Sequence, residues 1–249
     1  MIVRKSAAEI ETMREAGRVS ARALRVVGEA VVPGVTTAEL DEIAETVIRE
    51  AGGVPAFKGY HGFPKTLCTS VNSQVVHGIP SALVRLIVGD VLSVDVGAIV
   101  DGYYGDNART FAVGTISDEA QRLLETTEAS LMAGIAECRV GNHLFDIGAA
   151  VQGVAEAAGF GVVREYVGHG IGRNMHEDPN VPNYGQRGKG PRLERGMVLA
   201  IEPMVNAGTA SVDALPDGWT VVTRDGSLSA HFEHTVAITD DGPLVLTVE

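Results

Sequence analysis

Two aspartates interrupt a stretch that otherwise has the pattern of a buried β-hairpin. The stretch covers residues 91–113, and the Asp-Gly pair at 101–102 is a favoured two-residue hairpin turn. With that turn, Asp95 lies opposite Ala108 and Asp106 is its diagonal neighbour on the same face, because side chains alternate with a period of two. A buried, unpaired carboxylate loses several kcal/mol of hydration. The hairpin therefore predicts a cation between the acids, unless one aspartate caps the turn and the other faces solvent.

Two more isolated acids stand in apolar runs that predict central strands. Glu202 lies within residues 197–205, and Glu233 lies within residues 230–238. Neither has a basic neighbour in its strand. A lone glutamate in a strand is usually an edge or surface residue, but metal ligation accounts for all four acids together.

Two extended or glycine-rich segments carry candidate histidines, one before Asp95 and one between Asp106 and Glu202. The loop 167–180 carries His169 and His176, and either could serve as a metal ligand or as a proton carrier. Its Gly-x-Gly lacks the Lys-Ser/Thr ending and the third glycine of nucleotide-binding loops, which argues against a phosphate site. His77 ends another extended segment, where a lone histidine is more often structural.

These acids and one histidine predict a two-metal centre. Four carboxylates are too many for one four-coordinate zinc ion, whereas two dications balance their charge. A water shared by two such ions becomes a hydroxide nucleophile near neutral pH, and the chemistry expected is hydrolysis of an amide or ester. The candidate ligands are Asp95, Asp106, His169, Glu202 and Glu233.

The order of predicted elements repeats along the chain. Glycines at 34 and 141, and again at 52 and 159, align at a shift of 107 positions. We expect one α+β domain over residues 1–249, in which halves of roughly 1–115 and 116–249 each contribute helices and then strands to a central sheet. The predicted helices span 6–31, 37–52, 118–140 and 144–158, and the predicted strands span 67–72, 91–99, 103–113, 162–167, 197–205, 219–223 and 232–239.

Composition excludes several classes of protein. The net charge of −12 argues against a nucleic-acid-binding surface, which needs clustered Lys and Arg. No apolar stretch approaches the ~20 residues of a membrane span, and the N-terminus lacks the apolar region of a signal peptide. We therefore expect a cytoplasmic protein. Cys68 and Cys138 form no C-x-x-C pair, so no thiolate zinc site is indicated.

Taken together, these motifs resemble those of the type I methionine aminopeptidases in their short bacterial form. The resemblance covers nearly the whole chain and implies the pita-bread fold, with a pseudo-two-fold repeat and a central antiparallel sheet. It also implies removal of the N-terminal methionine from nascent proteins whose second residue is small. The motifs span residues 60–65, 76–80, 95 with 106, 169–172, 201–208 and 227–235.

The resemblance also implies a role for each site residue. Asp106 and Glu233 would bridge two metal ions, His169 and Glu202 would complete one site, and Asp95 the other. Glu202 would also move the proton, while His77 and His176 would hydrogen-bond the scissile peptide and its tetrahedral intermediate. The implied methionine-binding residues are Phe57, Tyr60, His61, Phe63, Cys68, His77, Met175, His176 and Trp219.

The same resemblance leaves some properties open. The two metals could be cobalt, manganese, iron, nickel or zinc. Phe57 and Met175 depart from the residue types common in the family, which affects the fine shape of the pocket. A monomer acting near the ribosome after deformylation is expected. The alternatives are an X-prolyl aminopeptidase or prolidase of the same fold, which usually carries an additional N-terminal domain, and a non-catalytic descendant, which typically loses ligands.

Overall fold

The computed structural model describes residues 1–249 and contains four α-helices. They are α1 (Ala7–Ala30), α2 (Thr37–Glu50), α3 (Asp118–Ala136) and α4 (Leu144–Ala157). The first two begin with capping boxes, in which Ser6 pairs with Glu9 and Thr36 with Glu39. All four agree with the predicted helices, but α3 ends before the predicted position 140. The side-chain amide of Asn142 donates to the carbonyl of Glu137 (3.0 Å) and so satisfies a terminal carbonyl there.

The strands form one large antiparallel sheet and two small ones. The large sheet has the order β1-β4-β5-β14-β9-β7-β8, with β2 paired to β4 and β15 paired to β14. The strands are β1 (Val54–Pro55), β2 (Leu67–Val71), β3 (Gln74–Val76), β4 (Val91–Val100), β5 (Tyr103–Ala112), β6 (Gly161–Val162), β7 (Gly168–Gly170), β8 (Glu177–Val181), β9 (Val198–Ile201), β10 (Met204–Asn206), β11 (Val212–Ala214), β12 (Val221–Thr223), β13 (Ser229–His231), β14 (Glu233–Thr239) and β15 (Gly242–Val245). A short 3-10 turn, η1 (Tyr60–Gly62), precedes β2.

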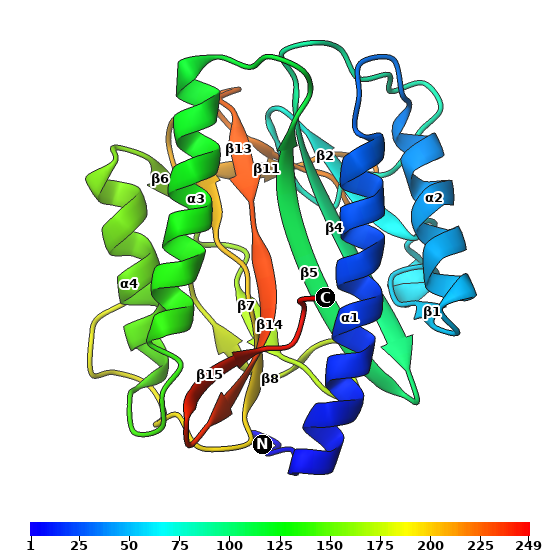
Figure 1. Cartoon of the computed structure of the whole chain (residues 1–249). Helices are drawn as coiled ribbons and strands as arrows, with labels where there is room; N and C mark the ends of the chain where they lie inside the picture. Colours follow the sequence, from blue (N-terminus) through cyan, green and yellow to red (C-terminus); the bar gives the residue numbers. More distant parts are fainter.

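The four helices cover one face of the curved large sheet (Figure 1). α1 packs on β4 and β5, whereas α3 packs on β9, β10, β13 and β14. The apolar core accordingly has two main parts, one of 14 buried residues between positions 23 and 113 and one of 22 residues drawn mainly from the second half. None of the helices combines the length and apolar character that a membrane crossing requires.

Matching hydrogen bonds confirm the internal repeat. In the first half, Gly34 N–H donates to the carbonyl of Leu86, and the equivalent residues 107 positions later, Gly141 and Leu193, make the same bond. The bridge between Thr36 and Arg85 recurs between His143 and Arg192 at the same shift. The repeat is therefore structural, and it predicts that β4 corresponds to β9.

Two predicted strands differ from those observed. The segment 162–167 is extended only through β6, because its pairing with β10 stops before the exposed Arg164 and Glu165. The segment 197–205 divides into β9 and β10 around Glu202 and Pro203. Proline has no N–H for the ladder, so β9 ends at this point.

Candidate metal centre and active site

One cavity of about 350 Å³ brings together every site residue that the sequence predicted. Its lining residues come from strands of the large sheet and from segments around positions 57–63, 77 and 219. The cavity is lined by Phe57, Tyr60, His61, Phe63, Cys68, His77, Asp95, Asp106, His169, Met175, His176, Glu202, Trp219 and Glu233. Sequence positions far apart in both halves thus share a single site.

The hairpin of β4 and β5 has the predicted register. Its turn residues, Asp101 and Gly102, both have positive φ (48° and 77°), as a type I′ turn requires. Asp95 pairs with Ala108, and Asp106 pairs with Gly97, which lies two residues after Asp95 on β4. The carboxylates of Asp95 and Asp106 therefore point to the same face of the sheet.

The second half contributes the remaining acids and the histidine. Glu202 follows β9 and lies 107 positions after Asp95, so the repeat places one acid at the same point of each half. Glu233 begins β14. Ligand atoms of Asp106, His169 and Glu233 all lie within 4.8 Å of one another. Nε2 of His169 is 3.5 Å from Oε1 of Glu202.

The buried oxygens of this cluster lack partners within the protein. Asp95 Oδ1, Asp106 Oδ1 and Glu233 Oε1 accept no hydrogen bond. Burial is the main cause that raises the pKa of the carboxyls of Asp95 and Glu233 well above their usual range. No lysine or arginine lines the cavity to compensate their charge. Unsatisfied buried carboxylates are costly, so this donor set fits divalent cations.

His169 has the protonation state of a metal ligand. Burial lowers the pKa of His169 to about 4, so the imidazole is neutral at pH 7. Its Nδ1 lies 2.9 Å from the carbonyl of Gly170, to which it donates. Nε2 is then the unprotonated nitrogen, and it faces the carboxylates.

The two histidines predicted to hydrogen-bond the scissile peptide, His77 and His176, flank the acids without joining the cluster. Nδ1 of His176 lies 2.8 Å from the hydroxyl of Tyr60, and the ring centroids of His176 and His169 are 4.2 Å apart. His77 lies edge-on to Tyr166, at 5.8 Å between ring centroids. Burial lowers the pKa of His77 to about 4 and also lowers that of His176. Both rings are therefore neutral at pH 7 and can each donate one hydrogen bond.

Beside the acids, the cavity has an apolar wall. Phe57, Phe63, Cys68 and Met175 form one buried cluster, and Trp219 packs edge-on against Phe63 with centroids 5.0 Å apart. Sulfur and aromatic groups of this kind make favourable contacts with a flexible thioether.

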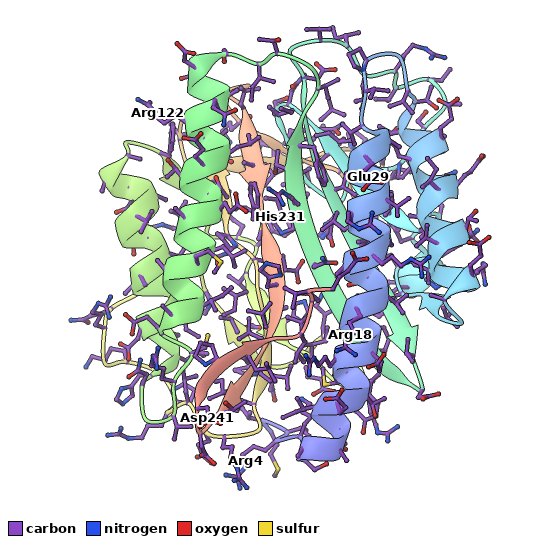
Figure 2. The ribbon with its side chains drawn as sticks, in the orientation of Figure 1. Arg4, Arg18, Glu29, Arg122, His231 and Asp241 are labelled. Atoms are coloured by element: carbon purple, nitrogen blue, oxygen red, sulfur yellow. The ribbon has the colours of Figure 1, made fainter.

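Sequence reasoning missed one residue of the site, His231. It is buried on β13, and its Nε2 has no hydrogen-bond partner and lies 3.8 Å from Oε2 of Glu202. Figure 2 labels His231 near the centre of the molecule. A signal was available, because His231 stands two positions before Glu233 and side chains in a strand alternate between faces.

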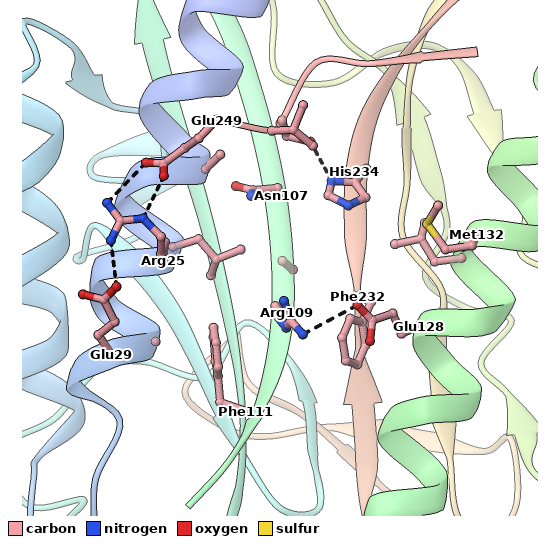
Figure 3. Close-up of a pocket in the computed structure, with 17 residues that line it drawn as sticks. Arg25, Glu29, Asn107, Arg109, Phe111, Glu128, Met132, Phe232, His234 and Glu249 are labelled. Atoms are coloured by element: carbon pink, nitrogen blue, oxygen red, sulfur yellow. Dashed lines mark hydrogen bonds and ion pairs between the residues drawn. The ribbon is translucent and has the colours of Figure 1, made fainter. Parts of the chain in front are cut away.

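A second, larger cavity of about 540 Å³ lies on the opposite, helix-covered face of the sheet (Figure 3). Asn107 and His234 line it, next in the chain to Asp106 and Glu233. Its two arginines are already paired, Arg25 with Glu29 and Glu249, and Arg109 with Glu128. No cluster of metal-ligand type converges there, so the smaller cavity is the candidate active site.

The fold and this acidic centre define a metal-dependent peptidase. Residues 11–240 match the model of metallopeptidase family M24, and the chain belongs to that family. Membership implies the use of divalent metal, in agreement with the unpartnered carboxylates.

Within this family the chain groups with the methionine aminopeptidases. It is 54% identical over 248 residues to the methionine aminopeptidase of Clostridium acetobutylicum, covering 100% of this chain and 99% of that one. The crystal structure of the Thermotoga maritima methionine aminopeptidase matches with a TM-score of 0.99 at 45% identity, over 100% of both chains. A prolidase from Pyrococcus horikoshii shares the fold, with a TM-score of 0.76 at 23% identity, but the match covers only 64% of that chain. The methionine aminopeptidases are thus favoured over the prolidase alternative.

Proposed function

We propose that this chain removes the N-terminal methionine from nascent proteins whose second residue is small. The observation that carries the proposal is a single cavity in which five side chains of metal-ligand type adjoin an apolar wall of aromatic and sulfur-containing residues. The acidic part suits the reacting amide bond, and the apolar part suits a methionine side chain. Relatives named for this activity match over the full length.

Five residues are proposed as ligands of two divalent ions. Asp106 and Glu233, which lie on the adjacent strands β5 and β14, would be shared by both ions. His169 and Glu202 would complete the set of ligands that holds one ion, and Asp95 the set that holds the other. When bound, the ions lower the pKa of a shared water and supply a hydroxide nucleophile at neutral pH. Cobalt, manganese, iron, nickel and zinc all suit these ligands.

The remaining polar side chains act on the peptide bond. Glu202 carries the proton from the attacking water to the departing amine, and its carboxylate lies between His169 and His231. His77 and His176 donate hydrogen bonds to the scissile carbonyl and to the oxyanion that develops from it. Nδ1 of His176 lies 2.8 Å from the hydroxyl of Tyr60. In the tautomer that suits this role, that hydroxyl donates to Nδ1 and the proton on Nε2 is directed to the substrate.

Specificity follows from the shape of the cavity. A methionine side chain lies against Phe57, Phe63, Cys68, Met175 and Trp219, with Tyr60 and His61 at the mouth. With methionine fixed there, the second residue lies against the cavity wall, so larger side chains at that position overlap with it. A free amine is required, so deformylation precedes the reaction. We further propose that the protein acts in the cytoplasm, near the ribosome, as a monomer.

A peptide assay combined with metal analysis tests this function. We expect two metal ions per chain and release of methionine from Met-Ala-Ser. Cleavage of Ala-Pro-type peptides without methionine release would favour an X-prolyl aminopeptidase. Binding of a Met-Ala-Ser peptide without turnover at full metal loading would favour a non-catalytic descendant.

A further inference from the structure

Lys5 is the one lysine or arginine among the buried residues of the chain. Its Nζ lies 2.7 Å from Oε2 of Glu177, and the two side chains are only 3% and 10% exposed. The ammonium also donates to the carbonyl of Val3 (3.2 Å). Burying a lysine is costly, so a partner of opposite charge and fixed geometry is required.

This ion pair joins two distant segments. The backbone N–H of Lys5 donates to the carbonyl of Gly196 (2.6 Å), which anchors it two residues before β9. Glu177 is the first residue of β8 and directly follows His176. The pair therefore ties the His176 loop to the scaffold that carries Glu202.

The loop wraps closely around the pair. Oε1 of Glu177 accepts the backbone N–H of Asn174 (3.2 Å). A Cβ on Gly172 would lie 2.6 Å from Cε of Lys5 and 2.7 Å from Oε1 of Glu177, so only glycine leaves room for this arrangement. Met175 and His176 lie between these two anchored points.

We propose that Lys5 is a positioning residue for catalysis, which holds the Met175–His176 segment against the active site through Glu177. The inference rests on the proposed function of His176 as a hydrogen-bond donor to the substrate. Lys5 touches neither substrate nor metal. Its removal leaves the Glu177 carboxylate without its cation and releases the loop.

The test compares Lys5→Met with the neighbouring variant Arg4→Met. Arg4 also pairs with an acid, Glu194, but both side chains are more than half exposed, and Figure 2 shows Arg4 pointing away from the protein. We expect Lys5→Met to keep two metals and to lose kcat about 10- to 100-fold with little change in KM, because small misplacement of a catalytic group is costly. Arg4→Met should behave like the wild type. Glu177→Gln keeps the acceptor for the backbone N–H of Asn174 and should lose kcat to the same extent as Lys5→Met. It takes the place of Lys5→Met in the test if Lys5→Met does not fold.

Two further measurements separate positioning from general stability. In a His176→Ala background, Lys5→Met should cause no additional loss of kcat. In the otherwise wild-type protein, Lys5→Arg should retain most of the activity that Lys5→Met loses. The NMR signals of the His176 ring should shift in Lys5→Met and not in Arg4→Met, a readout that does not depend on turnover. A kcat for Lys5→Met within twofold of that for Arg4→Met, or a full additional loss in the His176→Ala background, would overturn the inference. Absence of methionine release by the wild type would instead overturn the proposed function, while the NMR comparison would still test Lys5.

Discussion

Asp106 and Glu233 are buried acids on adjacent strands, and each has an oxygen without a partner in the protein. As proposed bridging ligands, each contributes an anion to both ions. We therefore expect Asp106→Asn and Glu233→Gln to lose bound metal and turnover together. Metal analysis by mass spectrometry, paired with the Met-Ala-Ser assay, checks this.

Asp101 provides the control in the same hairpin. It is exposed at the turn, and asparagine tolerates its positive φ of 48°. Asp101→Asn should keep both metals and full activity. Normal metal content in an inactive Asp106→Asn protein would count against the bridging role.

His77 and His176 should separate catalysis from metal binding. We expect His77→Ala and His176→Ala to keep two metals and to lose kcat by about 100- to 1,000-fold, the range measured for one oxyanion donor elsewhere. Steady-state kinetics and metal analysis of each variant check this. Loss of metal from either variant would reassign that histidine as a ligand.

The neutral state of His77 makes stability depend on pH. Its folded pKa of about 4 lies below the usual ~6.5, so the unfolded chain binds a proton in this interval that the folded chain does not. The stability that the neutral His77 contributes is fully present above pH ~6.5 and is lost as the pH falls towards 4. Between pH 7 and pH 5, the free energy of unfolding should fall by about 1 to 2 kcal/mol more in the wild type than in His77→Gln. Urea unfolding of both metal-free proteins at the two pH values measures this, and equal losses would be inconsistent with a buried neutral His77.

At the scale of elements, the contact between α1 and β5 depends on a glycine. A Cβ on Gly105 would lie 2.4 Å from the backbone nitrogen of Gly17 and 2.6 Å from the carbonyl carbon of Ala16. Neither atom can move without shifting the helix. Gly105→Ala should therefore lower the free energy of unfolding by about 1–3 kcal/mol, the usual cost of overpacking. It should also weaken metal binding, because Asp106 is the next residue.

Gly153 offers the opposite case within α4. A Cβ there meets nothing within 4 Å, and alanine is the better helix former. Gly153→Ala should raise the free energy of unfolding by about 0.4–1 kcal/mol. Thermal and urea unfolding of both variants check the pair. A Gly105→Ala protein as stable as the wild type would show that α1 can move away from β5 without cost.

At the scale of the whole molecule, the two halves complete a single site. Asp95 and Asp106 come from the first half, and His169, Glu202 and Glu233 come from the second. We propose that residues 1–249 act as one catalytic domain, because neither half alone holds the full set of ligands.

The chain also provides its own substrate test. Its second residue is Ile2, which is β-branched and larger than valine, so the proposed size rule predicts that Met1 is retained. Met1 itself is fully exposed in the folded protein, so burial does not protect it. Intact-mass analysis should show Met1 in the wild type and its loss in Ile2→Ala. Loss of one methionine from the wild type would refute the size rule.

The sequence by itself determined the features that depend on local chemistry. The capping box at Ser6, the Asp101-Gly102 turn and the register of Asp95 are set by neighbouring residues, so local rules predict them. The specific motifs around His169 and Glu233 indicated the family, which the full-length relatives confirm.

Only the tertiary structure decided the features that depend on distant contacts. The end of β6 before Arg164 depends on the length of β10, and the proximity of His231 to Glu202 depends on the packing of two strands. The burial of Lys5 against Glu177 joins residues 172 positions apart, and local sequence around either residue contains no sign of it. A buried charge is stabilised by whichever partner the fold brings to it, so its role becomes visible only when the whole chain is packed.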